Sequence, residues 1–349
     1  MKQFCPATQS EVFSQLRFPL IVLVVYAHTY SGVEAGYGVL TAGWDAYECL
    51  KIVLGQSLVK VAVPVFYVMS GYLFFSNVRQ WNVGVYLQKM KRRAWSLLVP
   101  YLLWNALLAY KYQVLDWQVF WTFYPSAGAQ FDWLGHEQLL TAPLNMPLWF
   151  LRDLIVVSLL SPVFHWVLSR VGGWGLLLAT VVYLSGVYAF IPGLSAYAVY
   201  FFGLGAYFGM RKQNLLDLTL RFERLSYVVS LLLLVTMLLT YGTKPFSSVM
   251  LCFRLVGAVA VLNISYRILS ATPRRIPAVV SASSYFIYLC HFAFGLLFID
   301  KALIFVLGHS TAASCLHYLL SSPLKVAVYL LVYVLYRRVR NLLKSLAHE

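Results

Sequence analysis

The first apolar stretch of the chain holds two ionisable side chains, Arg17 and His28, whose spacing could support chemistry. On an α-helix, eleven residues make about three turns and rise about 16 Å, so the two side chains share a face. A neutral imidazole can take the proton of an attacking hydroxyl, or it can carry a transferred group covalently. The pair therefore predicts an elongated polar strip along one face of the helix, with His28 as the residue that takes part in the reaction. A snorkelling arginine and a packed histidine are the alternative.

A second histidine competes for the same role. Ser284, Tyr288 and His291 recur at helical spacing and share one face of a later apolar stretch. This face could support His28 or contact an acceptor, or it could form an ordinary hydrogen-bonded contact between helices. His291 is therefore the rival to His28.

Other polar positions have two interpretations each. At Ser70 and Gly71 a ligand could approach the backbone and hydrogen-bond the serine, although close helix packing fits equally well. Arg254 lies in an apolar stretch, with Asp153 and Asp300 as the nearest acids by expected depth, so a structural ion pair is favoured. The five cysteines show no metal-type spacing, and no metal site is predicted.

Membrane helices must position these residues. The 349 residues are 61% hydrophobic and 11% charged, with a mean hydropathy of +0.73. A soluble domain usually carries about twice that charged fraction. Backbone groups in lipid must be satisfied within each segment, so apolar stretches of this length predict helices. We expect an all-α polytopic bundle, with residues 1–349 as a single domain and about ten spans, near 13–31, 54–76, 95–112, 148–168, 174–191, 195–210, 226–241, 247–266, 282–304 and 322–337.

The formal charge of +15 follows the membrane topology. Basic clusters and acidic loops alternate at the ends of successive spans. The basic clusters include Lys89–Arg93, Arg211–Lys212, Arg274–Arg275 and Arg337–Lys344, and the opposite ends hold Glu34, Asp45 and Glu48. The positive-inside rule then places both termini in the cytoplasm. No nucleic-acid partner is needed to explain the charge.

Five motifs resemble, in order, those of the acyltransferase-3 family of integral membrane acyltransferases. The first is Arg17 followed by His28 after ten residues. The others read VKVAVPVFYVMSGYLFF, KMKRRAWSLLVPYLLW, PLWFLRDL and SASSYFIYLCH. Together they cover the chain from Arg17 to His291. Many members carry a glutamate after the W–F–L motif, where this chain has Arg152–Asp153, so Asp153 is the candidate to replace it.

The resemblance implies transfer of an acyl group from coenzyme A to an extracytoplasmic hydroxyl. It implies catalysis by His28, acyl-CoA binding by Arg17, Ser70, Gly71, Arg92 and Arg93, and acceptor or supporting roles for Lys60, Trp149, Asp153, Tyr288 and His291. Guanidinium groups suit the phosphates of such a donor. For Arg92 and Arg93, a basic loop that only sets topology is the alternative.

These observations predict a multi-pass protein of the bacterial inner membrane that works as an O-acyltransferase, most simply an O-acetyltransferase. Its expected partners are acyl-CoA, a glycan or lipid-linked sugar acceptor and membrane lipids. Acetyl-CoA would be a cosubstrate, and no tightly bound cofactor is expected. A transporter or flippase for a glycan or acylated product is the alternative, since it also needs polar residues at depth. The chain shows no internal repeat of the kind many transporters have.

Overall fold

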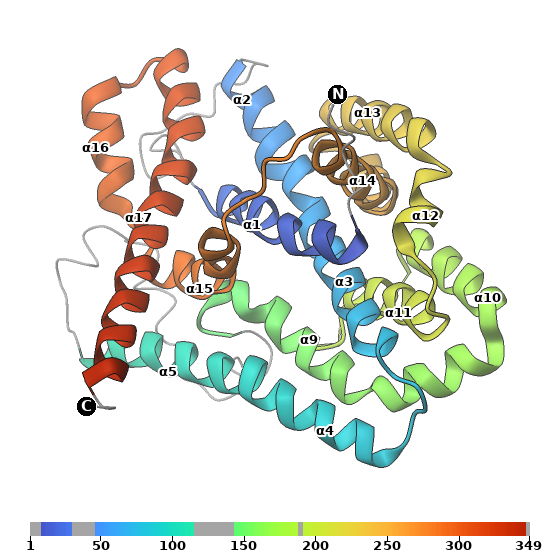
Figure 1. The fold of residues 1–349 in the computed structure, drawn as a ribbon. Coiled ribbons are helices and arrows are strands. Elements are labelled where there is room, and N and C mark those ends of the chain that lie inside the picture. The colour runs from blue at the N-terminus through green and yellow to red at the C-terminus, as the bar shows by residue number, and fades with distance from the viewer. Residues whose placement is uncertain (1–7, 30–45, 115–142, 188–190, 347–349) are drawn as a thin grey trace. The chain divides into compact units, whose positions relative to one another are not determined.

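The computed structural model describes residues 8–29, 46–114, 143–187 and 191–346, and within these ranges every regular element is a helix (Figure 1). The described chain divides into two compact units, Met1–Phe66 with Gln213–Glu349 and Tyr67–Lys212. The expected all-α class is therefore confirmed for these residues. The expectation that residues 1–349 form a single domain stays a prediction.

The first unit combines the N-terminal helices with the C-terminal half of the chain. It contains α1 (Gln9–Ala27), α2 (Ala46–Lys51), η1 (Ile52–Ser57), η2 (Leu58–Val61), α12 (Leu215–Leu220), α13 (Glu223–Leu239), α14 (Lys244–Ala271), α15 (Ala278–Phe294), α16 (Leu297–Leu307) and α17 (Thr311–Leu346). Helix α1 packs against α15, and it also contacts η2, α14 and α17.

Polar contacts fasten both ends of α1. Near its start, Gln15 exchanges hydrogen bonds of 2.6 and 3.3 Å with the backbone of Ile276, just before α15. At its end, the hydroxyls of Thr29 and Ser322 lie 2.6 Å apart, and Tyr26 donates to the carbonyl of Leu319 at 2.8 Å. The end of α1 that carries His28 is therefore held against α17.

The second unit contains most of α3 (Ala62–Ser76), followed by α4 (Val83–Arg93), η3 (Ala94–Leu98) and α5 (Val99–Val114). It continues with η5 (Met146–Leu148), α9 (Trp149–Leu159), α10 (Ser161–Ser185) and α11 (Ala196–Met210). Helix α11 crosses α3 closely: a Cβ on Gly71 would collide with the carbonyl of Phe202, and one on Gly205 with the carbonyl of Val68. Glycine at these positions lets the two backbones touch.

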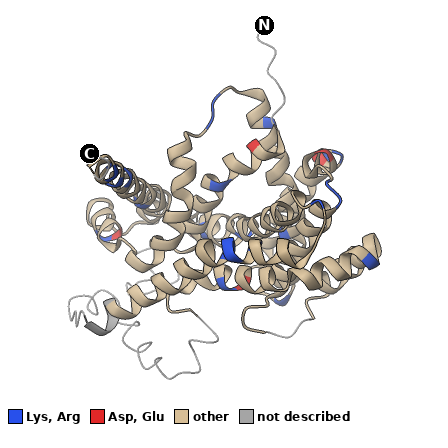
Figure 2. Cartoon of the chain, turned by 60° about the horizontal axis from the view of Figure 1, so that its bottom comes forward, with Lys and Arg blue, Asp and Glu red and all other residues tan. Residues whose placement is uncertain are grey.

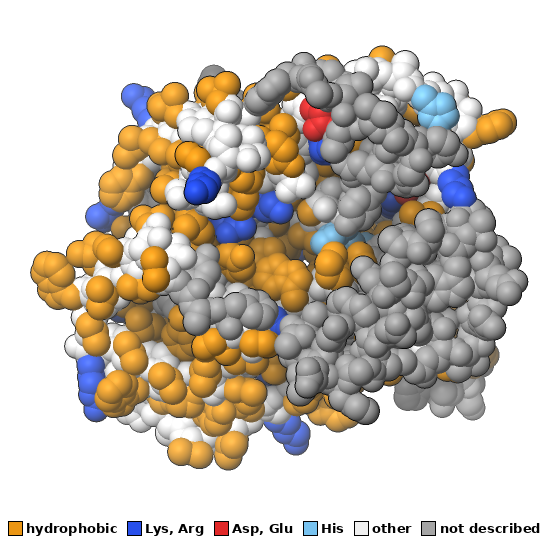
Figure 3. All heavy atoms as spheres, turned by 180° about the vertical axis from the view of Figure 1, so that it is seen from behind, with side chains coloured by type: hydrophobic (Ala, Val, Ile, Leu, Met, Phe, Trp, Pro, Cys, Tyr) orange, Lys and Arg blue, Asp and Glu red, His pale blue; other side chains and the backbone are white. Residues whose placement is uncertain are grey.

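Five described helical segments are long and apolar enough to cross a membrane: Gln9–Ala27, Ala46–Ser76, Ser161–Ser185, Lys244–Ala271 and Thr311–Leu346. Large apolar side chains also stay uncovered by protein, such as Phe305 at 90% exposed and Trp174 at 79%. Figure 3 shows hydrophobic side chains spread over one face of the described surface. The chain is thus a multi-pass membrane protein, whereas the count of ten spans stays a prediction.

The expected span 282–304 is not one straight helix. Helix α15 ends at Phe294 and α16 begins at Leu297, with a bend of 73° between them. Gly295 and Leu296 both adopt positive φ values, 56° and 49°, which a continuing right-handed helix does not allow. This break places His291 in the last turn of α15.

The expected spans 148–168 and 174–191 are also divided differently. Helix α9 ends at Leu159, and α10 starts at Ser161, within the first expected span, and ends at Ser185, within the second. Gly172, with φ 58°, kinks α10 between them. Helix α11 has only 15 residues. The last part of α17 is rich in basic residues: it contains Arg337, Arg338, Arg340 and Lys344. Figure 2 colours such residues blue along the ribbon of this helix.

Candidate active site

His28 and His291 lie side by side in the first unit. His28 caps the C-terminus of α1, where its backbone N–H donates to the carbonyl of Val25 at 3.1 Å. The centroid of its partly buried ring is 5.3 Å from that of His291 and 5.9 Å from that of Phe292. The structure therefore joins two imidazoles that are 263 positions apart in the sequence.

The surroundings of His291 define which of its nitrogens is an acceptor. Its ring is buried, and Nδ1 lies 2.7 Å from the carbonyl of Tyr288 and 3.3 Å from that of Ile287. A carbonyl oxygen only accepts, so Nδ1 carries the proton of the neutral ring and Nε2 keeps a lone pair. Nε2 is buried and has no hydrogen-bond partner among the described residues. The site thus contains an acceptor nitrogen beside His28.

One cation of the first unit lies within electrostatic reach of His28. Lys60 of η2 is partly buried, and its charge interacts with His28 and with Arg254 of α14. Asp153 and Asp300, the two acids expected to pair with Arg254, form ion pairs with other residues. Arg152 lies 2.9 Å from Asp153, and Lys325 lies 2.6 Å from Asp300.

A buried cluster around Asp300 was not predicted from the sequence. His317, Ser321 and Lys325 occupy one face of α17 at spacings of four residues. Ser321 donates to Oδ1 of Asp300 at 2.5 Å, Lys325 donates to Oδ2 at 2.6 Å, and Nε2 of His317 is 3.4 Å from Oδ1. One turn after Lys325, Tyr329 donates to the carbonyl of His291 at 3.0 Å. The sequence did contain a signal for this cluster: His317 and Lys325 are two ionisable residues eight positions apart on one face of an apolar helix.

Two of the expected donor-binding residues meet in the second unit. Nη2 of Arg93 donates to Oγ of Ser70 at 3.0 Å. Arg93 and Lys89 also lie over the ring of Phe74, 5.5 and 4.8 Å from its centroid. Burial, with Arg93 and Arg92 nearby, lowers the pKa of Lys89. The motifs of α3 and α4 therefore combine into one basic, aromatic-backed site.

The remaining donor residues are placed differently. Arg92 is exposed on α4. Arg17 is exposed on α1 and forms no ion pair with any described residue. Gly71 is buried against the backbone of α11, which accounts for a glycine there through packing alone. Donor binding by these three residues stays a prediction.

The other supporting residues lie in well-packed positions. Asp153 is fully buried in α9, and its Oδ2 has no hydrogen-bond partner among the described residues. Trp149, at the start of α9, contacts Phe150 and Tyr197 edge-on, with centroids 6.4 and 6.2 Å away. Tyr288 is buried, 6.2 Å from His291 between ring centroids. Acceptor contacts by these residues stay a prediction.

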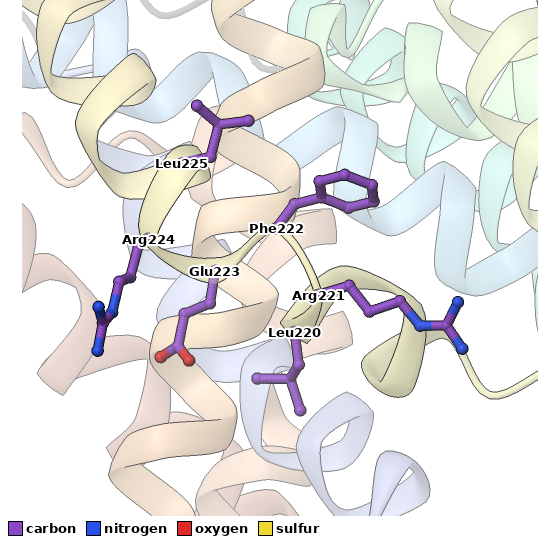
Figure 4. Close-up of a pocket in the computed structure, with 6 residues that line it drawn as sticks. All are labelled: Leu220, Arg221, Phe222, Glu223, Arg224 and Leu225. Atoms are coloured by element: carbon purple, nitrogen blue, oxygen red, sulfur yellow. The ribbon is translucent and has the colours of Figure 1, made fainter.

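A surface pocket elsewhere in the first unit has no site residue in its lining. Figure 4 shows its six consecutive residues: Leu220, Arg221, Phe222, Glu223, Arg224 and Leu225. Arg221 and Arg224 extend in opposite directions there. Glu223 accepts from Arg267 at 2.7 and 2.5 Å, and these hydrogen bonds hold the pKa of its carboxyl below the usual value. The pocket lies at the turn between α12 and α13, and none of the predicted catalytic or binding residues lines it.

Comparison with known proteins gives two matches. A family model described as an acyltransferase domain matches residues 13–336. The succinoglycan biosynthesis protein ExoH of Rhizobium meliloti (strain 1021) is 30% identical over 173 residues, which are 47% of this chain and 44% of that protein. The chain thus spans less than half the length of the curated relative it matches. No solved structure matches the chain.

Proposed function

The chain belongs to the acyltransferase-3 family, and from this premise we propose that it is a membrane O-acyltransferase. It moves an acyl group, most simply acetyl, from cytoplasmic acyl-CoA to a hydroxyl of an extracytoplasmic or lipid-linked glycan. Both termini lie in the cytoplasm, about ten helices cross the membrane, and that membrane is the bacterial inner membrane. The alternating charge of the loops supports this orientation.

The observation that carries the proposal is the contact between His28 and His291 at the end of α1. His28 takes the proton of the acceptor hydroxyl as the oxygen attacks the thioester carbonyl. The carbon–sulfur bond breaks, and the leaving thiolate takes that proton back from His28. In the covalent form of the reaction, His28 first carries the acyl group itself. His291 supports either form with its acceptor nitrogen Nε2.

The donor is held by basic residues on the cytoplasmic side. In the second unit, Arg92 and Arg93, the latter oriented by its hydrogen bond to Ser70, are the proposed ligands of coenzyme A phosphates. The motif resemblance assigns the same role to Arg17 of the first unit. The arginine at position 17 is about 16 Å along the helix from His28, a length that an extended phosphopantetheine arm covers. Gly71 keeps the backbone of α3 thin next to Ser70.

The acceptor is a polysaccharide or its precursor. This part of the proposal is supported by the name of the relative, a protein of succinoglycan biosynthesis. Trp149 provides an aromatic face for a sugar ring, and Asp153, whose Oδ2 has no hydrogen-bond partner among the described residues, supports the acceptor site. The motif resemblance assigns further acceptor roles to Lys60 and Tyr288 of the first unit.

The test is binding and turnover of acetyl-CoA by the purified protein in detergent. We expect calorimetry to detect binding, and Arg17→Ala to weaken it by about 1.5–3 kcal/mol, the usual contribution of a hydrogen bond to a charged group. Lys91→Ala, at an exposed position on α4, serves as the matched control and should change binding little. If a well-folded protein binds no acyl-CoA and transfers no acyl group, the enzyme proposal fails and a transporter becomes the better hypothesis.

A further inference from the structure

We propose that Tyr26 and Tyr329 are positioning residues for acyl transfer. Their hydroxyls hold the two helix ends that carry His28 and His291 against α17, and so they set the separation of the two imidazoles. The inference rests on the proposed function, since it assigns further residues to the reaction at His28. Neither tyrosine is a catalytic residue in this account, because each acts through a histidine.

Tyr329 satisfies a backbone carbonyl at the point where α15 ends. The helix stops at Phe294, and the positive φ values of Gly295 and Leu296 turn the chain away from the helical path. The last four carbonyls of a helix have no N–H partner within the helix. The carbonyl of His291 is one of these four, and the buried hydroxyl of Tyr329 donates to it at 3.0 Å. The last turn of α15 is therefore held by α17.

Tyr26 satisfies a carbonyl that a proline leaves without its helical donor. Pro323 lies inside α17 and has no N–H, so it cannot bond the carbonyl of Leu319 four residues earlier. The hydroxyl of Tyr26 donates to this carbonyl at 2.8 Å. The end of α1 therefore docks where α17 offers an acceptor, and His28 follows Tyr26 by two residues.

A serine on α17 strengthens the docking of α1. Thr29 donates its hydroxyl proton to the carbonyl of Val25 at 3.0 Å, so Ser322 is the donor in the 2.6 Å contact between Thr29 and Ser322. Ser322 and Tyr329 are both buried and lie seven positions apart. Seven residues make about two turns and rise about 10 Å, so the two side chains share a face of α17. One face of one helix thus holds both histidine-bearing ends.

Helix α17 is itself fixed between these two contacts. Lys325 donates to the buried Asp300 of α16 at 2.6 Å, and Ser321 donates to the same carboxylate. The imidazoles of His28 and His291 come from different helices, and their centroids are 5.3 Å apart. Their separation therefore depends on how each helix end is held. A misplacement of about 1 Å can cost about 10²-fold in rate, so the contacts of α17 bear on the reaction.

The first test measures acetyl transfer by the full chain in detergent. Tyr329→Phe and Tyr26→Phe each remove one hydroxyl and keep the ring. We expect each to lower kcat about ten-fold and to change KM by less than about two-fold, because the histidines shift while the substrate-binding residues stay in place. Tyr336→Phe, at an exposed position of α17, is the matched control and should change neither constant. Unchanged kcat in both folded variants overturns the proposal.

A double-mutant cycle separates positioning from general stability. If Tyr329 acts through His291, Tyr329→Phe should cause no further loss of kcat in a His291→Ala protein. A tyrosine that only stabilises the fold would lower kcat by the same factor in both backgrounds, and it would lower the melting temperature in parallel. That additive result would contradict the assignment of Tyr329. Should Tyr329→Phe not fold, Tyr26→Phe is tested against His28→Gln in the same way.

A third measurement does not depend on catalysis. In protein labelled with ¹⁵N-histidine, the ring signals of His28 and His291 are assigned from the His28→Gln and His291→Gln spectra. We expect Tyr329→Phe to shift the His291 signals and Tyr26→Phe to shift those of His28, with Tyr336→Phe shifting neither. If the wild type transfers no acyl group but these shifts occur, the acyltransferase proposal fails while the positioning of the histidine pair stands. If transfer occurs and the signals do not move, the positioning proposal fails alone.

Discussion

At the scale of single residues, the proposed chemistry depends on His28. We expect His28→Ala to lower acyl transfer by about 10²–10⁴-fold, the usual effect of losing a general base. His28→Gln keeps some hydrogen bonding but cannot take a proton, so it should be nearly as inactive. Transfer assays on purified variants, matched for expression and melting temperature, measure both effects.

The control for this prediction is His291→Ala, which we expect to be the milder change because His291 supports the reaction through His28. If His28 had only a structural role, the pattern would differ. The His28→Gln protein would keep its activity, and His28→Ala would be harmful mainly because it lowers the melting temperature. Normal transfer by a well-expressed His28→Ala protein would move the chemistry to His291.

The buried ion pair of Asp300 and Lys325 leads to a second residue-scale prediction. Lys325→Met leaves the Asp300 carboxylate buried without its cation, and breaking such a pair usually costs about 3–5 kcal/mol. The double variant Asp300→Asn with Lys325→Met removes both charges and should recover most of the melting temperature. Melting curves in detergent provide the measurement, with Lys344→Met as the exposed-lysine control. Equal losses in the single and double variants would contradict the ion-pair account.

At the scale of elements, the close crossing of α3 and α11 depends on two glycines, Gly71 and Gly205, which carry no side chain. A methyl group at Gly71 or Gly205 would meet backbone atoms of the facing helix, which cannot rotate away. We expect Gly71→Ala and Gly205→Ala each to destabilise the protein by about 1–3 kcal/mol, the usual cost of overpacking. Gly84→Ala, at an exposed position of α4, is the control and should change the melting temperature little.

This prediction also separates packing from donor binding. If Gly71→Ala only separates the two helices, Gly205→Ala should affect acetyl-CoA binding to the same degree, because it acts from the other side of the same crossing. A loss of binding confined to Gly71→Ala in a protein of normal stability would instead indicate direct contact with the donor.

At the scale of the whole molecule, orientation in the membrane can be tested independently of catalysis. The alternating loop charges predict that the segment before α4 is cytoplasmic and the segment between α5 and η5 is external. In a cysteine-free background of intact cells, Ser126→Cys should react with an impermeant maleimide and Gln80→Cys should not. Gln80 is exposed and precedes Asn82, the residue that caps α4. The reverse labelling pattern would invert the topology and remove the basis for a cytoplasmic donor.

The sequence by itself determined the class of the protein and its family. In apolar stretches long enough to cross a bilayer, a helix satisfies the backbone hydrogen bonds within the segment itself. Helices of this kind were found. The motif residues from Arg17 to His291 indicated the family that the comparison confirmed. Both inferences depend on local composition and order along the chain, which a sequence displays directly.

Only the tertiary structure decided which side chains meet. Helical periodicity assigns a residue to a face but does not name the helix that this face contacts. The pairing of His28 with His291 and that of Arg93 with Ser70 are therefore results of packing. The bend between α15 and α16 at Gly295 and Leu296 was also decided by the tertiary structure. A glycine in the sequence permits a helix to end but does not show that it ends there. Asp300 shows the difference most directly: its depth suggested Arg254 as a partner, but α16 packs on α17, so Lys325 and Ser321 hold it.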